Sequence, residues 1–373
     1  MGLHPGALPD FPWDSLTPYI ARASAHPDGI VNLSVGTPVD PTPRVVREAL
    51  AAAADAPGYP TTHGTLALRE AVVDWFARRR GVSGIDPAAV LPTVGSKEFV
   101  ALLPALLGLG AGDIVVHPAA AYPTYDVGAR LAGATPMPAD AVSDWAGNPA
   151  VKLVWVNSPS NPTGAVASRE YLADVVGAAR SIGAVVASDE CYAELPWNEP
   201  FVSDGVASIL DPAVCGDSHE SLLAVYSLSK QSNLAGYRAA FTAGDPQIIA
   251  GLLETRKHAG MIVPAPVQAA TVAALCDDTH VAAQREVYRA RREVLSAAIR
   301  EAGFRIDASD AGLYLWATRS ENCWQTLDFL AHHGIVAAPG EFYGSAAANH
   351  VRIALTATDE RISAAARRLV KAR

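Results

Sequence analysis

Short apolar runs alternate with amphipathic segments from about residue 90 to residue 245. Five runs have the length and continuous hydrophobicity of buried strands: 114–116, 153–156, 184–187, 222–225 and 239–242. Between two of them, Ser168 is placed to cap a helix that runs to Arg180, with Gly183 near its end. Apolar strands separated by helices predict an α/β fold with a mostly parallel sheet that is covered on both faces.

The pattern changes after Pro264 and Pro266. A helical stretch over 267–301, broken near 277–279, is followed by strand-like 312–316, a helix over 324–332, strand-like 351–355 and a final helix. This order predicts a smaller α+β domain, against which the aromatic and proline-rich N-terminal segment packs. We therefore expect a large domain of residues 38–265 and a small domain of residues 1–37 and 266–373.

Polar segments directly follow three of the expected strands, at 157–164, 188–192 and 227–230. In an open α/β sheet, ligands bind outside the carboxyl ends of the strands. The functional site is therefore expected at this edge of the sheet.

Lys230 is the first candidate for a reactive group. The chain has only five lysines among its 29 lysine and arginine residues, and Lys230 alone follows an apolar run, 222–226. An apolar site and a nearby cation, Arg238, both lower the pKa of an amine and favour its neutral, nucleophilic form. This suits a lysine that forms a Schiff base with a carbonyl cofactor, although a salt-bridged lysine at a strand end would give the same pattern.

Asp189 and Tyr192 end the strand that we expect beside the one carrying Lys230. A buried carboxylate needs a partner, which is a backbone cap, an arginine or the protonated ring nitrogen of a cofactor. In the last case Tyr192 reaches the phenolic oxygen of the ring. Asn161, in the loop after the preceding strand, can donate to a ring oxygen or to a carboxylate.

A phosphate seat is predicted where Ser96 and Lys97 open a helix, because the first backbone N–H groups of a helix have no partner within it. Ser227 and Arg238 can complete this seat, Arg238 through a bidentate contact. The Lys97 side chain either adds charge or is simply solvated.

Two further residues stand out. Arg352 interrupts an apolar strand and is either a salt bridge to a neighbouring domain or a planar donor for a substrate carboxylate. Tyr122, before Pro123, either stacks on a cofactor ring or packs in the core.

Composition excludes several classes. The net charge of −9 and the pI near 5.6 argue against a nucleic-acid partner. The four cysteines form no CxxC pair and the histidines have no metal-ligand spacing, so no disulfide framework and no metal site are expected. The N-terminus lacks a signal-peptide pattern, and no apolar stretch reaches the ~18 residues of a membrane span. We expect a soluble, cytoplasmic protein.

Three motifs together resemble the fold-type I aminotransferases that use pyridoxal 5′-phosphate (PLP). They are Asn161-Pro-Thr-Gly164, Asp189-Glu-Cys-Tyr192 and Ser227-Leu-Ser-Lys230, with Arg238 eight residues beyond the lysine and a late arginine on a strand. The resemblance spans nearly the whole chain. It implies a large domain with a mostly parallel, seven-stranded-type sheet sandwiched by helices, and a smaller α+β domain.

The resemblance implies roles for these residues. Lys230 binds PLP covalently, Asp189 pairs with its pyridine nitrogen, and Tyr192 contacts its phenolate oxygen. The remaining cofactor contacts are implied for Asn161, Ser227, Arg238, Ser96, Lys97 and, by stacking, Tyr122.

It also implies a shared site. Tyr59 matches the tyrosine that reaches the cofactor phosphate of the neighbouring subunit, which implies a homodimer. Gly36, Asn161 and Arg352 match positions that bind the substrate carboxylate.

Within the family the chain is most similar to N-succinyldiaminopimelate aminotransferases, on segments 11–14, 31–41 and 229–238. This implies a ping-pong reaction of lysine biosynthesis, with L-glutamate as amino donor and N-succinyl-2-amino-6-ketopimelate as acceptor. One departure is Cys191, which we expect to face away from the cofactor ring.

Other activities share parts of this pattern. An aspartate or aromatic aminotransferase, or a PLP-dependent β-lyase, would use the same cofactor cage. A sensor with this fold would need an attached binding domain. Ser227-x-x-Lys230 also matches the nucleophile motif of serine acyl enzymes, but the S-D-N and K-T-G tripeptides of that class are absent from the sequence.

Overall fold

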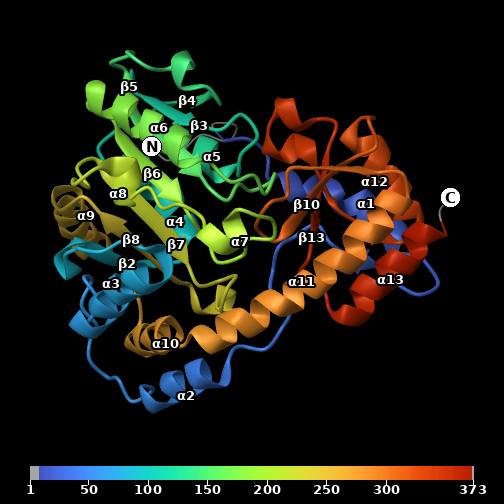
Figure 1. The fold of residues 1–373 in the computed structure, drawn as a ribbon, viewed down its shortest axis with the longest axis horizontal. Coiled ribbons are helices and arrows are strands. Elements are labelled where there is room, and N and C mark those ends of the chain that lie inside the picture. The colour runs from blue at the N-terminus through green and yellow to red at the C-terminus, as the bar shows by residue number, and fades with distance from the viewer. Residues whose placement is uncertain (1–7, 372–373) are drawn as a thin grey trace.

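The computed structural model of the chain describes residues 8–371, in which a seven-stranded sheet forms the largest layer (Figure 1). Its strand order is β2-β8-β7-β6-β5-β3-β4, and β8 alone runs against the others. The α/β prediction is therefore confirmed. The strands are β2 Val90–Val94, β3 Ile114–His117, β4 Thr135–Pro138, β5 Val151–Asn157, β6 Val185–Asp189, β7 Leu222–Ser227 and β8 Ala239–Gly244.

Helices cover both faces of this sheet because its central strands are apolar on both sides. The helices of the chain are α1 Thr17–Ser24, α2 Arg44–Ala52, α3 Leu66–Arg80, α4 Ser96–Leu106, α5 Thr124–Ala132, α6 Arg169–Ser181, α7 Phe201–Asp204, α8 Pro212–Cys215, α9 Pro246–Ala259, α10 Ala265–Leu275, α11 Asp278–Glu301, α12 Cys323–His332 and α13 Asp359–Val370. One face packs against α3, α6, α8 and α10, and the other against α4, α5 and α9.

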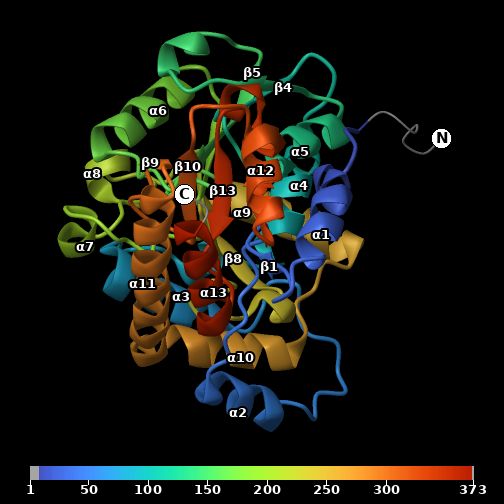
Figure 2. The same ribbon diagram turned by 90° about the vertical axis from the view of Figure 1, so that its right-hand side faces the viewer.

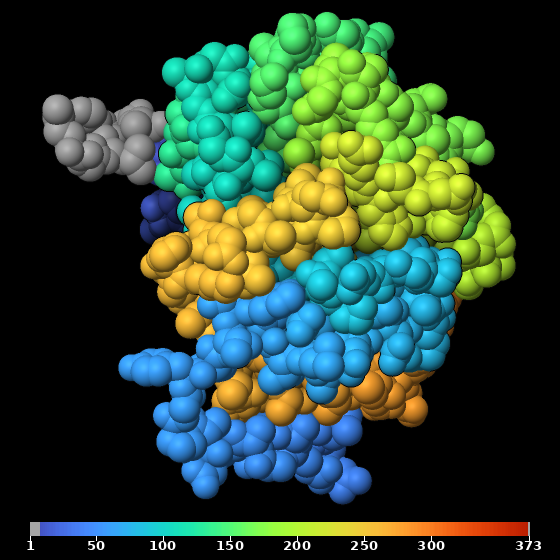
Figure 3. All heavy atoms as spheres, turned by 90° about the vertical axis from the view of Figure 1, so that its left-hand side faces the viewer, coloured from blue at the N-terminus to red at the C-terminus, as the bar shows by residue number. Residues whose placement is uncertain are grey.

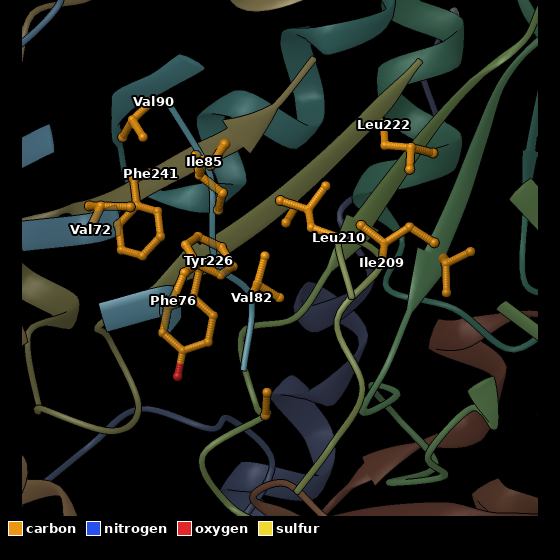
Figure 4. Packing of buried hydrophobic residues seen from close by; sticks show 14 of the residues in the cluster. Val72, Phe76, Val82, Ile85, Val90, Ile209, Leu210, Leu222, Tyr226 and Phe241 are labelled. Atoms are coloured by element: carbon orange, nitrogen blue, oxygen red, sulfur yellow. The ribbon is translucent and has the colours of Figure 1, made fainter. Parts of the chain in front are cut away.

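Aromatic side chains fill much of the first face. Figure 4 shows Phe76 of α3 beside Tyr226 of β7 and Phe241 of β8, with Val72 next to them. The rings of Tyr226 and Phe241 stack with centroids 5.7 Å apart. Burying one such side chain stabilises the fold by roughly 1.5–3 kcal/mol, so this cluster firmly attaches α3 to the sheet.

A smaller antiparallel sheet of order β12-β13-β10-β9 lies beside the large one, with α11, α12 and α13 around it (Figure 2). Its strands are β9 Arg305–Asp307, β10 Tyr314–Thr318, β12 Ala338–Pro339 and β13 Val351–Ala354, and β1 Val31–Asn32 pairs separately with β11 Ile335–Val336. The expected packing of the N-terminal segment is seen, because α1 contacts α12. The boundaries 38–265 and 1–37 with 266–373 stay a prediction, and residues 1–7 and 372–373 lie outside the described part.

Helix ends follow the predicted capping residues. Ser168 caps α6 through the Tyr171 N–H, and the long helical stretch breaks where expected. Helix α10 ends at Leu275, and the Asp277 side chain accepts the Thr279 N–H at the start of α11. Local capping therefore sets these boundaries.

The strand ends that carry the candidate residues are adjacent. Asn157 of β5 pairs with Asp189 of β6, and Asp189 pairs with Val225 of β7. The carboxyl ends of the three strands consequently form one rim of the sheet, facing β10 and β13 of the smaller sheet.

Residues 8–371 contain neither a membrane-spanning helix nor a cluster of metal-ligating side chains. No helix there is long and apolar enough to cross a membrane. No group of three or more His, Cys, Asp and Glu side chains in the same range is arranged to hold a metal ion.

Candidate active site

A cavity of about 550 Å³ lies at the rim of the large sheet, where β5, β6 and β7 end. Every predicted site residue except Tyr59 lines it: Gly36, Ser96, Lys97, Tyr122, Asn161, Asp189, Tyr192, Ser227, Lys230, Arg238 and Arg352. Residues from positions 36 to 352 thus meet in one place because strand ends, a helix start and the smaller sheet converge there.

Lys230 follows β7 directly, and its Nζ donates to the Gly36 carbonyl oxygen. Burial lowers the pKa of Lys230, and the cations Arg352 and Arg238 lower it further. No carboxylate forms an ion pair with Lys230 among residues 8–371, so the alternative of a salt-bridged lysine is wrong. The amine is held in the condition that favours nucleophilic attack.

Asp189 is buried at the end of β6 and is held by two donors. Its Oδ2 accepts the Tyr125 hydroxyl at 2.9 Å, and its Oδ1 accepts the Cys191 N–H at 3.2 Å. Burial raises the pKa of Asp189, while the hydrogen bonds from Cys191 and Tyr125 lower it. No arginine or lysine pairs with it in the described chain, so the carboxylate is oriented but lacks a cationic partner.

The neighbouring carboxylate, Glu190, turns away from the cavity. Its oxygens contact the Arg80 guanidinium, the Ser208 hydroxyl and the Ile209 N–H. Asp189 and Glu190 are consecutive but face different surroundings. Asp189 lies in the cavity, and Glu190 pairs with Arg80 of α3.

The helix α4 begins at Ser96, so its first N–H groups face the cavity. Gly95, with φ of +77°, precedes it, and a Cβ built there would lie 2.0 Å from an Arg238 Nη. Glycine is therefore required both for the backbone angle and for the approach of the guanidinium. Ser227 adds a hydroxyl, which bonds to the Ser229 hydroxyl at 2.8 Å.

Arg352 of β13 is 3% exposed and faces the cavity from the smaller sheet. Its two Nη atoms donate to the Asn161 Oδ1 and the Ser34 carbonyl oxygen, both at 2.7 Å, and its Nε has no partner. No carboxylate pairs with it among residues 8–371, so the interpretation as an interdomain salt bridge is wrong. A buried cation with neutral neighbours leaves a place for an anionic ligand.

Tyrosine rings surround this guanidinium. The Tyr314 ring lies 3.9 Å from it and the Tyr343 ring 4.9 Å from it. The Tyr192 hydroxyl is 3.1 Å from the Tyr314 hydroxyl. Burial raises the pKa of Tyr192, and so does Tyr314 beside it.

Cys191 is a correction. We expected it to face away from the site, but it lines the cavity beside Ser96 and Asp189. The reason is local: β6 ends at Asp189, and the turn in which Asp189 accepts the Cys191 N–H breaks the strand alternation. Burial and Asp189 raise the pKa of the Cys191 thiol well above its usual value, so the thiol stays protonated.

Tyr59 lies apart from the cavity and is fully exposed. The blue segment around residue 50 also projects from the surface in Figure 3. The cavity of one chain is thus formed without this side chain.

Several cavity residues were missed from the sequence: Phe11, Trp13, Tyr125 and Tyr314. Tyr125 lies in the first turn of α5, three residues after Tyr122, and no motif in the sequence marks it. Tyr314 looked like an ordinary aromatic residue of a strand.

Comparison with known proteins matches residues 28–369 to the family model of aminotransferase class I and II. The chain belongs to this family. It is 59% identical to the 4-dedimethylamino-4-oxo-anhydrotetracycline transaminase OxyQ of Streptomyces rimosus, over 97% of this chain and 99% of the relative. It is 58% identical to a probable aminotransferase of Mycobacterium tuberculosis, over 97% of this chain and 85% of that protein.

A solved structure of a probable N-succinyldiaminopimelate aminotransferase from Thermus thermophilus is also similar. It has a TM-score of 0.85 and 28% identity, and it covers 97% of this chain and 100% of that one. The protein is thus an aminotransferase, with the fold that the sequence predicted.

Class I and II aminotransferases depend on PLP, and the cavity of this aminotransferase fits that cofactor. It offers an amine at Lys230, an oriented carboxylate without a cation at Asp189, and a helix start with Arg238 for a phosphate. Any side chain at position 95 would fill the space beside the Arg238 guanidinium. Each charged part of PLP therefore has a complementary group.

Proposed function

We propose that this aminotransferase moves the amino group of L-glutamate to N-succinyl-2-amino-6-ketopimelate, in a homodimer and by a ping-pong sequence. The observation that carries the amino-acid chemistry is the buried guanidinium of Arg352, which has no carboxylate partner among residues 8–371 and lies in the same cavity as the Lys230 amine. A substrate α-carboxylate satisfies Arg352, and its α-carbon then lies towards Lys230.

The role of each residue follows from its position in the cavity. When bound, PLP supplies an electron sink for the bonds at the substrate α-carbon. Lys230 would hold the cofactor through its amine, and the same amine would serve as the base that moves the proton of the substrate α-carbon. Burial lowers the pKa of Lys230 and so favours the neutral amine that this transfer requires.

The other residues hold the cofactor. Asp189 keeps the ring nitrogen protonated, and Tyr192 with Asn161 contacts the ring oxygen. Ser227, Arg238 and the backbone N–H groups of Ser96 and Lys97 hold the phosphate, and Tyr122 covers the ring. Gly36 and Arg352 position the substrate carboxylate.

The acceptor is the finer part of the proposal. Support comes from the likeness to the Thermus thermophilus structure and from Lys97, whose Nζ lies 5.9 Å from the centroid of the Phe11 ring at the cavity wall. This ammonium has no ion pair among residues 8–371 and suits the distal carboxylate of a succinylated acceptor.

A second candidate acceptor is a polycyclic ketone like that in the name of OxyQ, to which the chain is 59% identical. The apolar residues Phe11, Trp13 and Val35 in the cavity wall favour it.

A homodimer is supported by the surface. Five of the ten exposed large hydrophobic residues of the described chain lie within residues 35–66: Val35, Val39, Val45, Tyr59 and Leu66. Exposed apolar side chains gain by burial, and a second copy that packs on this stretch of the chain would cover them.

The test is the visible spectrum of the purified protein with PLP, before and after L-glutamate. We expect the band of lysine-bound cofactor to disappear with glutamate, to return with the succinylated keto acid, and to be absent from Lys230→Ala, whose turnover is abolished. If the tetracycline-type ketone restores the band with a higher kcat/KM, the acceptor proposal fails and aminotransfer stands. A band that ignores glutamate would contradict the donor, and keto-acid-independent product formation would indicate a β-lyase.

A further inference from the structure

Tyr314 occupies a central position that no sequence motif assigns. It is 3% exposed on β10, and its ring lies against the Arg352 guanidinium. A Cβ built on Gly36 would lie only 2.2 Å from the Tyr314 hydroxyl oxygen. The phenol therefore fills the space that the missing side chain of Gly36 leaves open, beside the carbonyl oxygen that Lys230 contacts.

Within the described part of the chain, the Tyr314 hydroxyl has one hydrogen-bond partner, the hydroxyl of Tyr192 at 3.1 Å. The 3.1 Å contact allows either hydroxyl to donate, but only one of the two can do so at a time. Tyr192 has a single hydroxyl proton, and in the proposed function this proton goes to the ring oxygen of the cofactor. Tyr314 is then the donor in the bond between the two tyrosines.

We propose that Tyr314 is a positioning residue, which donates to the Tyr192 oxygen and so directs the Tyr192 hydroxyl proton at the ring oxygen of the cofactor. This inference rests on the proposed function, in which Tyr192 contacts that oxygen. A hydroxyl that accepts one hydrogen bond becomes a stronger donor in the next. Tyr314 thus acts on the cofactor through Tyr192 and needs no contact with it.

The test is a pH titration of the absorption band of the lysine-bound cofactor, without substrate. The ring oxygen accepts a hydrogen bond from Tyr192 and also attracts the proton on the Lys230 nitrogen. When the hydrogen bond from Tyr192 is weaker, the oxygen holds that proton more strongly. The midpoint then moves to higher pH. We expect Tyr314→Phe to raise the midpoint by about half a pH unit, since one hydrogen bond strengthens the next by roughly 10–30%. Tyr192→Phe should raise it further.

The double variant decides whether Tyr314 works through Tyr192. If it does, Tyr314→Phe adds no shift in the Tyr192→Phe background. Tyr343→Phe is the matched control, because the Tyr343 ring also lies against Arg352 but its buried hydroxyl has no partner in the described structure. We expect Tyr343→Phe to leave the midpoint unchanged.

A second variant tests the same contact by sterics. The Cβ of Gly36→Ala would displace the Tyr314 hydroxyl, and we expect the midpoint to rise here as well, again only while Tyr192 is present. An unchanged midpoint in Tyr314→Phe would overturn the inference, as would an equal shift with and without Tyr192. A wild-type protein with no cofactor band would instead overturn the proposed function, so the two failures are distinguishable.

Discussion

At the scale of single residues, the orientation of Asp189 depends on the aromatic residues behind it. Tyr125 donates to Asp189, and its own ring stacks on Trp155 of β5 with centroids 5.0 Å apart and meets the edge of Tyr122. Two residues of the sheet core therefore fix a carboxylate that the proposed mechanism uses. The geometry is set before any ligand binds, which reduces the cost of ordering the site.

We predict that Tyr125→Phe keeps the fold and lowers kcat by about tenfold, the effect of one hydrogen bond to a charged group. The Tyr125 hydroxyl lowers the pKa of Asp189, so its loss raises that pKa and moves the acidic limb of the kcat profile to higher pH. The measurement is kcat against pH for both proteins. Tyr171→Phe, in which a half-exposed hydroxyl far from the cavity is removed, is the control.

Site residues at strand ends could be predicted from the sequence because a polar motif after an apolar run has a fixed place in an α/β sheet. Tyr314 could not, since its neighbours are given by the pairing of β10 with β13 and by the approach of Gly36, which are long-range contacts. Cys191 was predicted wrongly because strand alternation does not extend through a turn.

At the scale of elements, three consecutive arginines at the end of α3 form ion pairs with different partners. Arg78, Arg79 and Arg80 form the last turn of α3, where cations complement the helix dipole. In the structure they pair with three different carboxylates, Asp278, Glu194 and Glu190, and only the Arg80 pair has both side chains almost fully buried. Arg80 thereby links α3 to the turn that follows Asp189.

We predict that Arg80→Met destabilises the protein by about 3–5 kcal/mol, because it leaves the buried Glu190 carboxylate without its cation. Arg78→Met is the control on the same helix and should cost less than about 1 kcal/mol, since its pair with Asp278 is exposed. Urea unfolding measures both. The double variant Arg80→Met with Glu190→Gln should recover part of the loss, and equal stabilities for the two arginine variants would contradict this account.

Elements with strong periodicity were predicted correctly, but two of the seven strands of the large sheet were not. β4 has the sequence Thr-Pro-Met-Pro and β2 contains Pro92, and proline within a run indicates a loop. Both lie at the edges of the sheet, where one side of the strand needs no partner and proline is tolerated. Sequence patterns cannot show which strand will be an edge, because that depends on the order of the whole sheet.

At the scale of the whole molecule, the proposed dimer connects an exposed tyrosine to the chemistry. Tyr59 is fully exposed and does not line the cavity of its own chain. In the dimer it would reach the phosphate of the neighbouring cofactor, so that each site would need two chains.

We predict that mixing subunits restores activity. Lys230→Ala is inactive and Tyr59→Ala is weakly active when PLP is limiting, but a hybrid dimer of the two has one complete site. Random pairing makes half of the dimers hybrid, so the mixture should reach about a quarter of wild-type activity. The assay is transamination after co-refolding, and activity no higher than the mean of the two parents would contradict a shared site.

Two parts of the cavity come from stretches that are far apart in the sequence. Its chemically active floor comes from the ends of β5, β6 and β7, whereas Phe11, Trp13, Val35 and Thr37 of its wall come from the N-terminal segment. Mutations in that segment can change the shape that a substrate must have while the strand ends keep their arrangement. An ancestral enzyme of this form could therefore have acquired new acceptors by drift in a few wall positions, and descendants with a common catalytic floor could serve unrelated metabolic routes.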